Sequence, residues 1–163
     1  MANIILIGMP GCGKSTVGVI LAKTLGIGFI DTDLIIQQRE NRLLQNIIDT
    51  DGIDYFLNCE ADAVKSLDCD NCVVATGGSV VYREDAVQHL KSNGKIIFLD
   101  VPLDEIKMRL NNINTRGIAA KKNKSIEDIY NERIALYNKY ADVIIKTDSE
   151  SVEKTVEKIC KLF

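Results

Sequence analysis

The sequence predicts an α/β fold in which a five-stranded parallel sheet is flanked by helices. Short apolar segments alternate along the chain with longer segments of helical periodicity, and this alternation is typical of βαβ units. A glycine-rich stretch joins the first apolar segment to the first helical one. The chain has 163 residues, of which 46% are hydrophobic and 26% charged, so we expect one domain spanning residues 1–163.

Five short apolar segments are the predicted strands. They are mostly rich in branched side chains, as expected for strands of a parallel sheet that is covered on both faces. The segments are residues 3–7, 28–30, 72–75, 95–99 and 143–145.

Helical periodicity fills the intervals between these strands. Apolar residues recur at positions 17, 20, 21 and 25, and again at 152, 156, 159 and 163, which is the spacing of one helix face. Gly26 is a stop signal for the first of these helices. Ser125, followed by Glu127 and Asp128, has the pattern of a helix start. The long polar stretch 111–124 is expected to be a functional loop or a disordered one.

Composition argues against several classes of protein. The net charge is −3 and the pI is about 5.2, and no cluster of Lys or Arg stands out, so we expect no nucleic-acid partner. No apolar run reaches the roughly 18 residues that a membrane span needs, and the N-terminal residues lack the pattern of a secretion signal. We therefore expect a cytoplasmic protein with no membrane partner.

The five cysteines predict neither a disulfide framework nor a metal site. Their number is odd, which suits reduced thiols inside a cell. Cys69 and Cys72 form a single CxxC pair, and a zinc site would need a second pair of ligands, whereas His89 is the one histidine. We interpret the CxxC pair as a chance spacing.

The stretch GMPGCGKST at residues 8–16 fits the phosphate-binding loop pattern Gly-x-x-x-x-Gly-Lys-Ser. Its glycines let backbone N–H groups surround an anion, and the N-terminus of the following helix adds partial positive charge. A glycine-rich turn that binds nothing is the alternative, but the strand before it and the helix after it favour the phosphate site. The expected nucleotide-binding residues of the loop are Gly8, Gly11, Cys12, Gly13, Lys14, Ser15 and Thr16.

Asp31 and Asp33 follow the second predicted strand. Open α/β sheets bind ligands at the carboxyl ends of their strands, so both carboxylates are expected to face a nucleotide-bound metal or a substrate hydroxyl. An aspartate here can instead cap the next helix, which contributes about 1 kcal/mol. We expect one of the two to cap the helix and favour Asp33 as the one that acts on the substrate.

A phosphate-binding loop alone does not separate kinases from switch GTPases or motor ATPases. The sequence has no Asn/Thr-Lys-x-Asp element for reading guanine, and 163 residues leave little room beyond a core sheet and a lid. The residues by themselves therefore indicate phosphoryl transfer to a hydroxyl group.

Several further segments, in order and across nearly the whole chain, resemble the shikimate kinase family. Besides the loop they are FIDTDLIIQQR (29–39), DGIDYF (51–56) with Glu60, ATGGSVV (75–81), FLDVPLDEIKMRL (98–110) and ERIALYNKYAD (132–142). The loop is common to many kinases, but the combination of Asp-Thr-Asp, Thr-Gly-Gly and the segment 133–137 is far more specific. The resemblance implies a P-loop kinase fold with a mobile lid at about residues 111–124 and an acceptor-binding region at about residues 33–60.

The resemblance also implies a reaction. It is the transfer of the γ-phosphoryl group of ATP, with Mg²⁺, to the 3-hydroxyl of shikimate, on the route to chorismate and the aromatic amino acids. In such a step the protein mainly positions the reacting oxygens and neutralises developing charge. Most family members act as monomers, and we expect the same here.

On the nucleotide side, the resemblance assigns four roles. Lys14 holds the β- and γ-phosphates, and Ser15 ligates Mg²⁺, with Asp31 reaching the metal through water. Arg116, at the position of the lid arginine of the family, closes over the phosphates and excludes water.

On the acceptor side, Asp33 orients the hydroxyl and takes its proton. Gly77 and Gly78 let the chain pass close to the ring of the substrate, with Ser79 beside them, and Arg133 binds its carboxylate. The expected catalytic residues are thus Asp33, Lys14 and Arg116.

One departure from the family concerns the substrate carboxylate. The family has an arginine after the phenylalanine of its F-R-x-x-E element, and here that position is Leu57. A bidentate guanidinium contact contributes about 1.5 to 3 kcal/mol, or roughly 10- to 150-fold in affinity. Either Arg133 holds the carboxylate alone, or another basic side chain replaces the arginine, or the natural acceptor lacks this carboxylate.

Two further departures concern the glycine turn and the lid. Ser79 replaces the third glycine of the usual triplet, where its side chain can crowd the ring or donate a hydrogen bond. The lid reads Arg-Gly-Ile-Ala at 116–119, whereas the family typically has Arg-Pro-Leu-Leu. Glycine in place of proline loosens a loop, so we expect slower or less complete closure and some ATP turnover without an acceptor.

Two kinds of function are consistent with the sequence. The first is a small-molecule kinase, with shikimate as the leading acceptor and a related polyol or hydroxy acid as the alternative. The second is a nucleotide-binding module with a degenerate acceptor site. Lys14, Asp33 and Arg133 favour the enzyme, and Leu57 favours the module.

Overall fold

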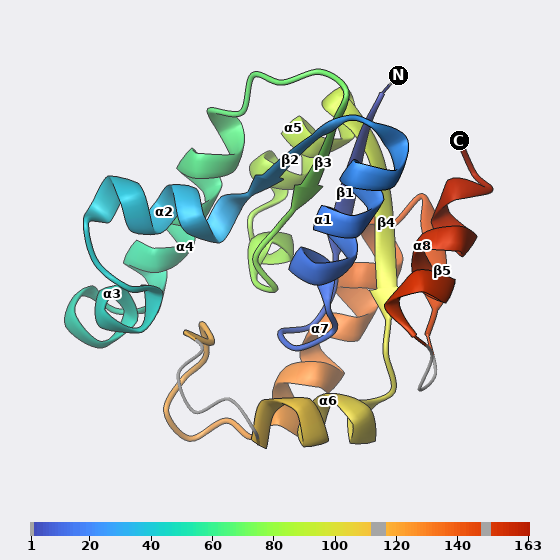
Figure 1. Ribbon diagram of the computed structural model, residues 1–163. Helices are drawn as coiled ribbons and strands as arrows, with labels where there is room; N and C mark the ends of the chain where they lie inside the picture. The colour runs from blue at the N-terminus through green and yellow to red at the C-terminus, as the bar shows by residue number, and fades with distance from the viewer. Residues whose placement is uncertain (1, 112–116, 148–150) are drawn as a thin grey trace.

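A parallel sheet of five strands forms the centre of the molecule. The computed structural model describes residues 2–111, 117–147 and 151–163 (Figure 1). The strands are β1 (Asn3–Ile7), β2 (Gly28–Asp31), β3 (Cys72–Ala75), β4 (Gly94–Asp100) and β5 (Val143–Lys146). They lie in the order β2-β3-β1-β4-β5, and all neighbouring pairs are parallel. The five predicted strands are confirmed, each within two residues of its expected ends.

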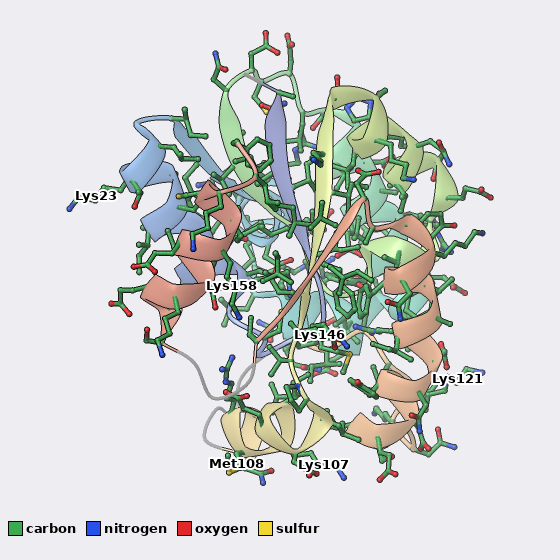
Figure 2. The ribbon with its side chains drawn as sticks, turned by 90° about the vertical axis from the view of Figure 1, so that its right-hand side faces the viewer. Lys23, Lys107, Met108, Lys121, Lys146 and Lys158 are labelled. Carbon is green, nitrogen blue, oxygen red and sulfur yellow. The ribbon has the colours of Figure 1, made fainter. Side chains whose placement is uncertain are left out.

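Helices cover both faces of this sheet. On one face lie α1 (Lys14–Leu25) and α8 (Val152–Cys160), which pack on each other, and on the other lie α5 (Glu84–Asn93) and α7 (Ile126–Tyr140) (Figure 2). Every residue of the central strand β1 is buried. Coverage on both faces explains why the strands read as continuous apolar runs rather than as alternating patterns.

The predicted helix signals act as expected. Gly26 follows α1 in the left-handed conformation, and its N–H donates to the carbonyl of Ala22. Ser125 caps α7: its hydroxyl accepts from the N–H of Asp128, whose carboxylate accepts from the N–H of Ser125, both at 3.1 Å. This reciprocal pair lowers the pKa of Asp128, chiefly through the backbone hydrogen bond.

A second group of helices extends from the sheet beside β2. It comprises α2 (Thr32–Glu40), α3 (Leu44–Asp51) and α4 (Ile53–Lys65), and α4 also packs on α5. These helices enclose an apolar cluster of their own, formed by Ile36, Ile47, Phe56, Leu57, Ala63 and Ala119. Ala119 belongs to a distant segment of the chain, so the cluster joins the predicted lid to the acceptor-binding region.

Segments near the carboxyl ends of the strands complete the fold. A short 3₁₀ turn, η1 (Val80–Tyr82), follows β3, and α6 (Leu103–Asn111) follows β4. Residues 117–125 lead from there to α7, and Figure 1 shows them below α2 and α3. Arg116 lies outside the described residues. No helix in the described part of the chain is both long and apolar enough to span a bilayer.

Candidate active site

A cavity of about 350 Å³ opens at the carboxyl ends of the central strands. Its walls come from the loop before α1, helix α2, the start of α3, helix α4, the turn after β3, residues 117–119 and helix α7. Ten residues that the sequence predicts for the site line it: Gly11, Gly13, Lys14, Ser15, Thr16, Asp33, Gly77, Gly78, Ser79 and Arg133. Gly8, Cys12 and Asp31 are absent from this lining. Each contacts a residue that does line the cavity: Gly8 and Cys12 contact Lys14, and Asp31 contacts Ser15.

The loop before α1 presents a helix N-terminus to the cavity. Gly13 precedes the helix with φ 93° and ψ 17°, and no side chain caps the first turn. A residue with a side chain rarely adopts this left-handed conformation. The N–H groups of the first turn therefore remain available to an anion, and the partial positive charge of the helix favours a phosphate there.

Lys14 holds the loop in shape. Its side chain is buried, and Nζ donates to the carbonyls of Gly8 at 2.8 Å and Met9 at 3.0 Å, with Cys12 Sγ at 3.6 Å. The N–H of Cys12 donates to Met9, and its sulfur lies in the core. Cys12 thus shapes the loop, and its N–H is already bonded within it. A phosphate would compete with the loop carbonyls for the ammonium group of Lys14.

Ser15 and Asp31 place two side-chain oxygen atoms next to each other beside the loop. The hydroxyl of Ser15 donates to Oδ2 of Asp31 at 2.7 Å, and Oδ1 of Asp31 accepts from the N–H of Asp33 at 3.0 Å. Asp31 is therefore the cap of α2, which leaves Asp33 to face the cavity. A hydroxyl and a carboxylate at this spacing fit Mg²⁺, which prefers oxygen ligands and keeps several of its waters.

Two glycines after β3 allow a close approach of backbone and side chains. A methyl group on Gly77 would lie 2.0 Å from Oε2 of Glu60 and 2.9 Å from Oδ1 of Asp33. A methyl group on Gly78 would lie 3.0 Å from Nη1 of Arg133. Any side chain at Gly77 would therefore collide with the two carboxylates, which explains the glycine in physical terms.

Arg133 places a buried positive charge at the cavity. Its side chain is 1% exposed, Nη2 donates to the carbonyl of Ala119 at 2.8 Å, and Nε donates to the hydroxyl of Tyr82 at 3.2 Å. Burial alone would lower the pKa of Arg133, but the phenols of Tyr137 and Tyr82 outweigh it and the pKa is raised. No carboxylate among the described residues pairs with this charge within 4.0 Å. An anionic group of a ligand would satisfy it.

Glu60 is a cavity residue that sequence reasoning did not assign. It lies on α4, it is 1% exposed, and Oε1 accepts a hydrogen bond of 2.7 Å from the hydroxyl of Ser79. Burial, together with the nearby charge of Asp33, raises the pKa of Glu60 to about 8. The one available signal was its place in the segment that resembles the family pattern, three residues after Leu57.

Arg109 is a second residue that the sequence did not indicate. It lies on α6, far along the chain from the loop, yet Nη1 donates to the carbonyl of Gly11 at 3.1 Å. Glu105, one turn earlier on the helix, pairs with the same guanidinium group at 2.5 Å. The side chain therefore braces the phosphate-binding loop through the carbonyl of Gly11, while Glu105 balances its charge.

Leu57 lies outside the cavity lining. It is buried in the apolar cluster of the α2–α4 helices. Among the described residues, Lys14 and Arg133 are the cationic side chains that line the cavity, and Arg133 is the one on the acceptor side. On the acceptor side of the described cavity, Arg133 is thus the side chain that could hold a carboxylate.

Gly117 has a role that the sequence did not reveal. A methyl group there would lie 2.7 Å from Cβ of Leu44 and 2.9 Å from the backbone nitrogen of Gln45. Residues 117–119 therefore pack directly on the start of α3, with Ala119 buried in the apolar cluster. Besides loosening the chain, the glycine permits this close contact across the cavity.

Replacing Gly117 with alanine is expected to raise the KM for the acceptor about 5- to 150-fold, because overpacking of this kind costs about 1–3 kcal/mol. The added methyl group would push residues 117–119 off α3 and displace the carbonyl of Ala119 from Arg133. Steady-state kinetics with varied acceptor would measure the effect. Lys121→Ala, an exposed change in the same segment (Figure 2), is the matched control. An unaltered KM in Gly117→Ala would mean that closure does not require this contact.

A phosphate-binding loop on a sheet of order 2-3-1-4-5, facing a carboxylate across a cavity, defines a small P-loop phosphotransferase of the kinase type. A family model described as shikimate kinase matches residues 10–163. The chain belongs to the shikimate kinase family.

Individual relatives agree with this assignment. The chain is 36% identical to the shikimate kinase of Clostridium botulinum (strain Alaska E43 / Type E3) over 161 residues, covering 98% of this chain and 96% of the relative. It superposes on the shikimate kinase of Acinetobacter baumannii in complex with shikimate with a TM-score of 0.92 at 28% identity, covering 99% and 92% of the two chains. For the enzyme of Aquifex aeolicus the TM-score is 0.81 at 32% identity, covering 98% and 94%.

Proposed function

We propose that this protein transfers the γ-phosphoryl group of ATP to the 3-hydroxyl of shikimate, giving shikimate 3-phosphate for the synthesis of chorismate and aromatic amino acids. The observation that carries the proposal is one cavity that holds the phosphate-binding loop, Asp33 and the buried charge of Arg133, which pairs with no carboxylate of the described residues. Shikimate has the matching groups: hydroxyls for the carboxylate and a carboxylate for the guanidinium.

The residues divide the work between nucleotide and acceptor. The N–H groups at the start of α1 and the ammonium group of Lys14 bind the β- and γ-phosphates. Arg133 binds the carboxylate of the acceptor and so brings a hydroxyl to Asp33, which takes its proton. Arg116, on the lid, is proposed to close over the phosphates.

Ser15 and Asp31 are the proposed Mg²⁺ ligands, directly and through water. When bound, the ion neutralises charge on the phosphates. The Ser15–Asp31 hydrogen bond keeps both side chains at the loop before the ion arrives.

A coupled assay of ADP release would test the proposal. Release is expected with shikimate, and much less with a panel of related hydroxy acids and polyols or with no acceptor. Tight ATP binding without shikimate-dependent release would instead support the nucleotide-binding module, whose main support in the sequence is Leu57.

Replacing Leu57 with arginine is expected to lower the KM for shikimate roughly 10- to 150-fold, the range for a bidentate contact to a carboxylate. Steady-state kinetics would measure it. Because Leu57 is buried in an apolar cluster, the Leu57→Met variant and thermal unfolding of both variants control for lost packing. An unchanged KM in a folded Leu57→Arg protein would mean that the carboxylate does not lie near this position.

We further propose a cytoplasmic monomer that binds neither nucleic acid nor membranes. The acidic net charge of −3 supports the proposal that the protein binds no nucleic acid. Light scattering of the purified protein would test the oligomeric state, with a mass near 18.1 kDa expected for a monomer.

A further inference from the structure

Glu60 is the one fully buried acidic side chain among the described residues. Its partner for Oε1 is a neutral hydroxyl, that of Ser79. Oε2 is buried as well and receives no hydrogen bond from any residue that the structure describes. Leu57, one turn earlier on α4, supplies no charge. Within the part of the chain that the structure describes, a carboxylate anion here would have no ion-pair partner within 4.0 Å, which is a costly arrangement.

Oε2 of Glu60 points into the space above Gly77. A methyl group added to Gly77 would lie 2.0 Å from this oxygen and 2.9 Å from Oδ1 of Asp33. The two carboxyl groups, from α4 and α2, thus share one small space that only a glycine leaves open. Like charges this close disfavour double ionisation, so one of the two groups holds a proton.

The surroundings decide which group holds it. Burial and the charge of Asp33 raise the pKa of Glu60, while the Ser79 hydroxyl, Arg133 on α7 and Lys14 on α1 lower it, and the result is about 8. At neutral pH the proton therefore resides on Glu60.

We propose that Glu60 is a neutral acid in the native protein and that its Oε2–H donates a hydrogen bond to the carboxylate of Asp33. The inference rests on the proposed function for the role of Asp33. Glu60 is then a positioning residue: it orients the carboxylate of Asp33 and keeps a second negative charge away from an anionic substrate. Ser79 orients Glu60 through Oε1.

Two measurements test the protonation state without any need for activity. The first is the ¹³C NMR titration of the Glu60 carboxyl group, identified by its absence in Glu60→Gln. A midpoint near 8 is expected, and a midpoint near the ordinary 4.5 would overturn the proposal. In Asp33→Asn the midpoint is expected to fall, because the neighbouring negative charge is gone. An unmoved midpoint would overturn the contact with Asp33.

The second measurement is the pH dependence of unfolding. Between pH 4.5 and about 8, Glu60 holds a proton in the folded protein but not in the unfolded chain. The stability of the wild type therefore falls as the pH rises through this window, and it levels off above it. Relative to Glu60→Gln, the unfolding equilibrium constant of the wild type is expected to rise about tenfold per pH unit. Parallel curves for the two proteins would contradict a buried neutral acid.

Kinetics test the positioning role. In the wild type, kcat/KM for shikimate is expected to fall above pH 8, by about tenfold per unit well beyond the midpoint. Glu60→Gln should lack this fall, since its amide stays a neutral donor, and it should recover most of the activity lost in Glu60→Ala. Ser79→Ala removes a hydrogen bond that lowers the pKa of Glu60. In this variant the fall of kcat/KM should therefore begin at a higher pH. An alkaline fall that persists in Glu60→Gln would overturn the role of Glu60.

The results that would refute the kinase assignment differ from those that would refute the proposal for Glu60. A wild type that releases no ADP with shikimate would refute the kinase assignment, while the titration and unfolding measurements would still decide whether Glu60 is neutral and contacts Asp33.

Discussion

Asp33→Asn is expected to lower kcat for shikimate phosphorylation about 100- to 1000-fold. General bases contribute about 10²–10⁴-fold. Because phosphoryl transfer passes through a loose transition state with little bonding to the nucleophile, the lower part of this range applies. Asparagine preserves the shape of the side chain, and the cap of α2 depends on Asp31 rather than Asp33. The fold and ATP binding should therefore be retained.

The measurement is kcat by coupled assay, together with the Kd for ATP by calorimetry. Asp54→Asn is the matched control, because Asp54 lies on α4 with a side chain that is 97% exposed. It should leave kcat unchanged. A kcat of Asp33→Asn within tenfold of the wild type would show that the acceptor hydroxyl needs no base at this position.

Lys14→Met is expected to lower kcat about 100- to 1000-fold, the usual effect of removing one donor that stabilises transition-state charge. ATP binding should weaken at the same time, since the ammonium group also binds the ground-state phosphates. In the ligand-free structure, Lys14 also bonds the carbonyls of Gly8 and Met9. Their loss is expected to lower the free energy of unfolding by about 1–3 kcal/mol.

Lys23→Met provides the control on the same helix, because Lys23 is an exposed lysine in the last turn of α1 (Figure 2). Activity and stability should both stay near wild type. If Lys14→Met turned over ATP at the wild-type rate, the loop would not be the phosphate site, and the site assignment would have to be abandoned.

The apolar cluster around Leu57 shows where sequence comparison and structure diverge. Reading the sequence against the family marks position 57 as a missing cation. In the structure the leucine is part of the packing that joins α2, α3, α4 and Ala119. The substitution therefore changes two properties together: it removes a charge and strengthens the contact between the helices and residues 117–119.

The sequence by itself determined the architecture and most of the candidate site. Strands buried on both faces must be apolar throughout, and helix starts and stops need particular residues, so both leave local patterns such as those at Ser125 and Gly26. The phosphate-binding loop is likewise local, because its glycines, Lys14 and the helix that follows are consecutive in the chain. Asp33 could be assigned because it follows a strand directly.

Only the tertiary structure decided which distant groups share the cavity and in what state of charge. Glu60, Ser79 and Asp33 come from three separate elements, and their approach depends on the absence of a side chain at Gly77. The burial of Arg133, the position of Arg109 beside the loop, and the contact of Gly117 with α3 arise in the same way. The physical reason is that desolvation and charge–charge interactions depend on distances in space, which local sequence patterns do not encode.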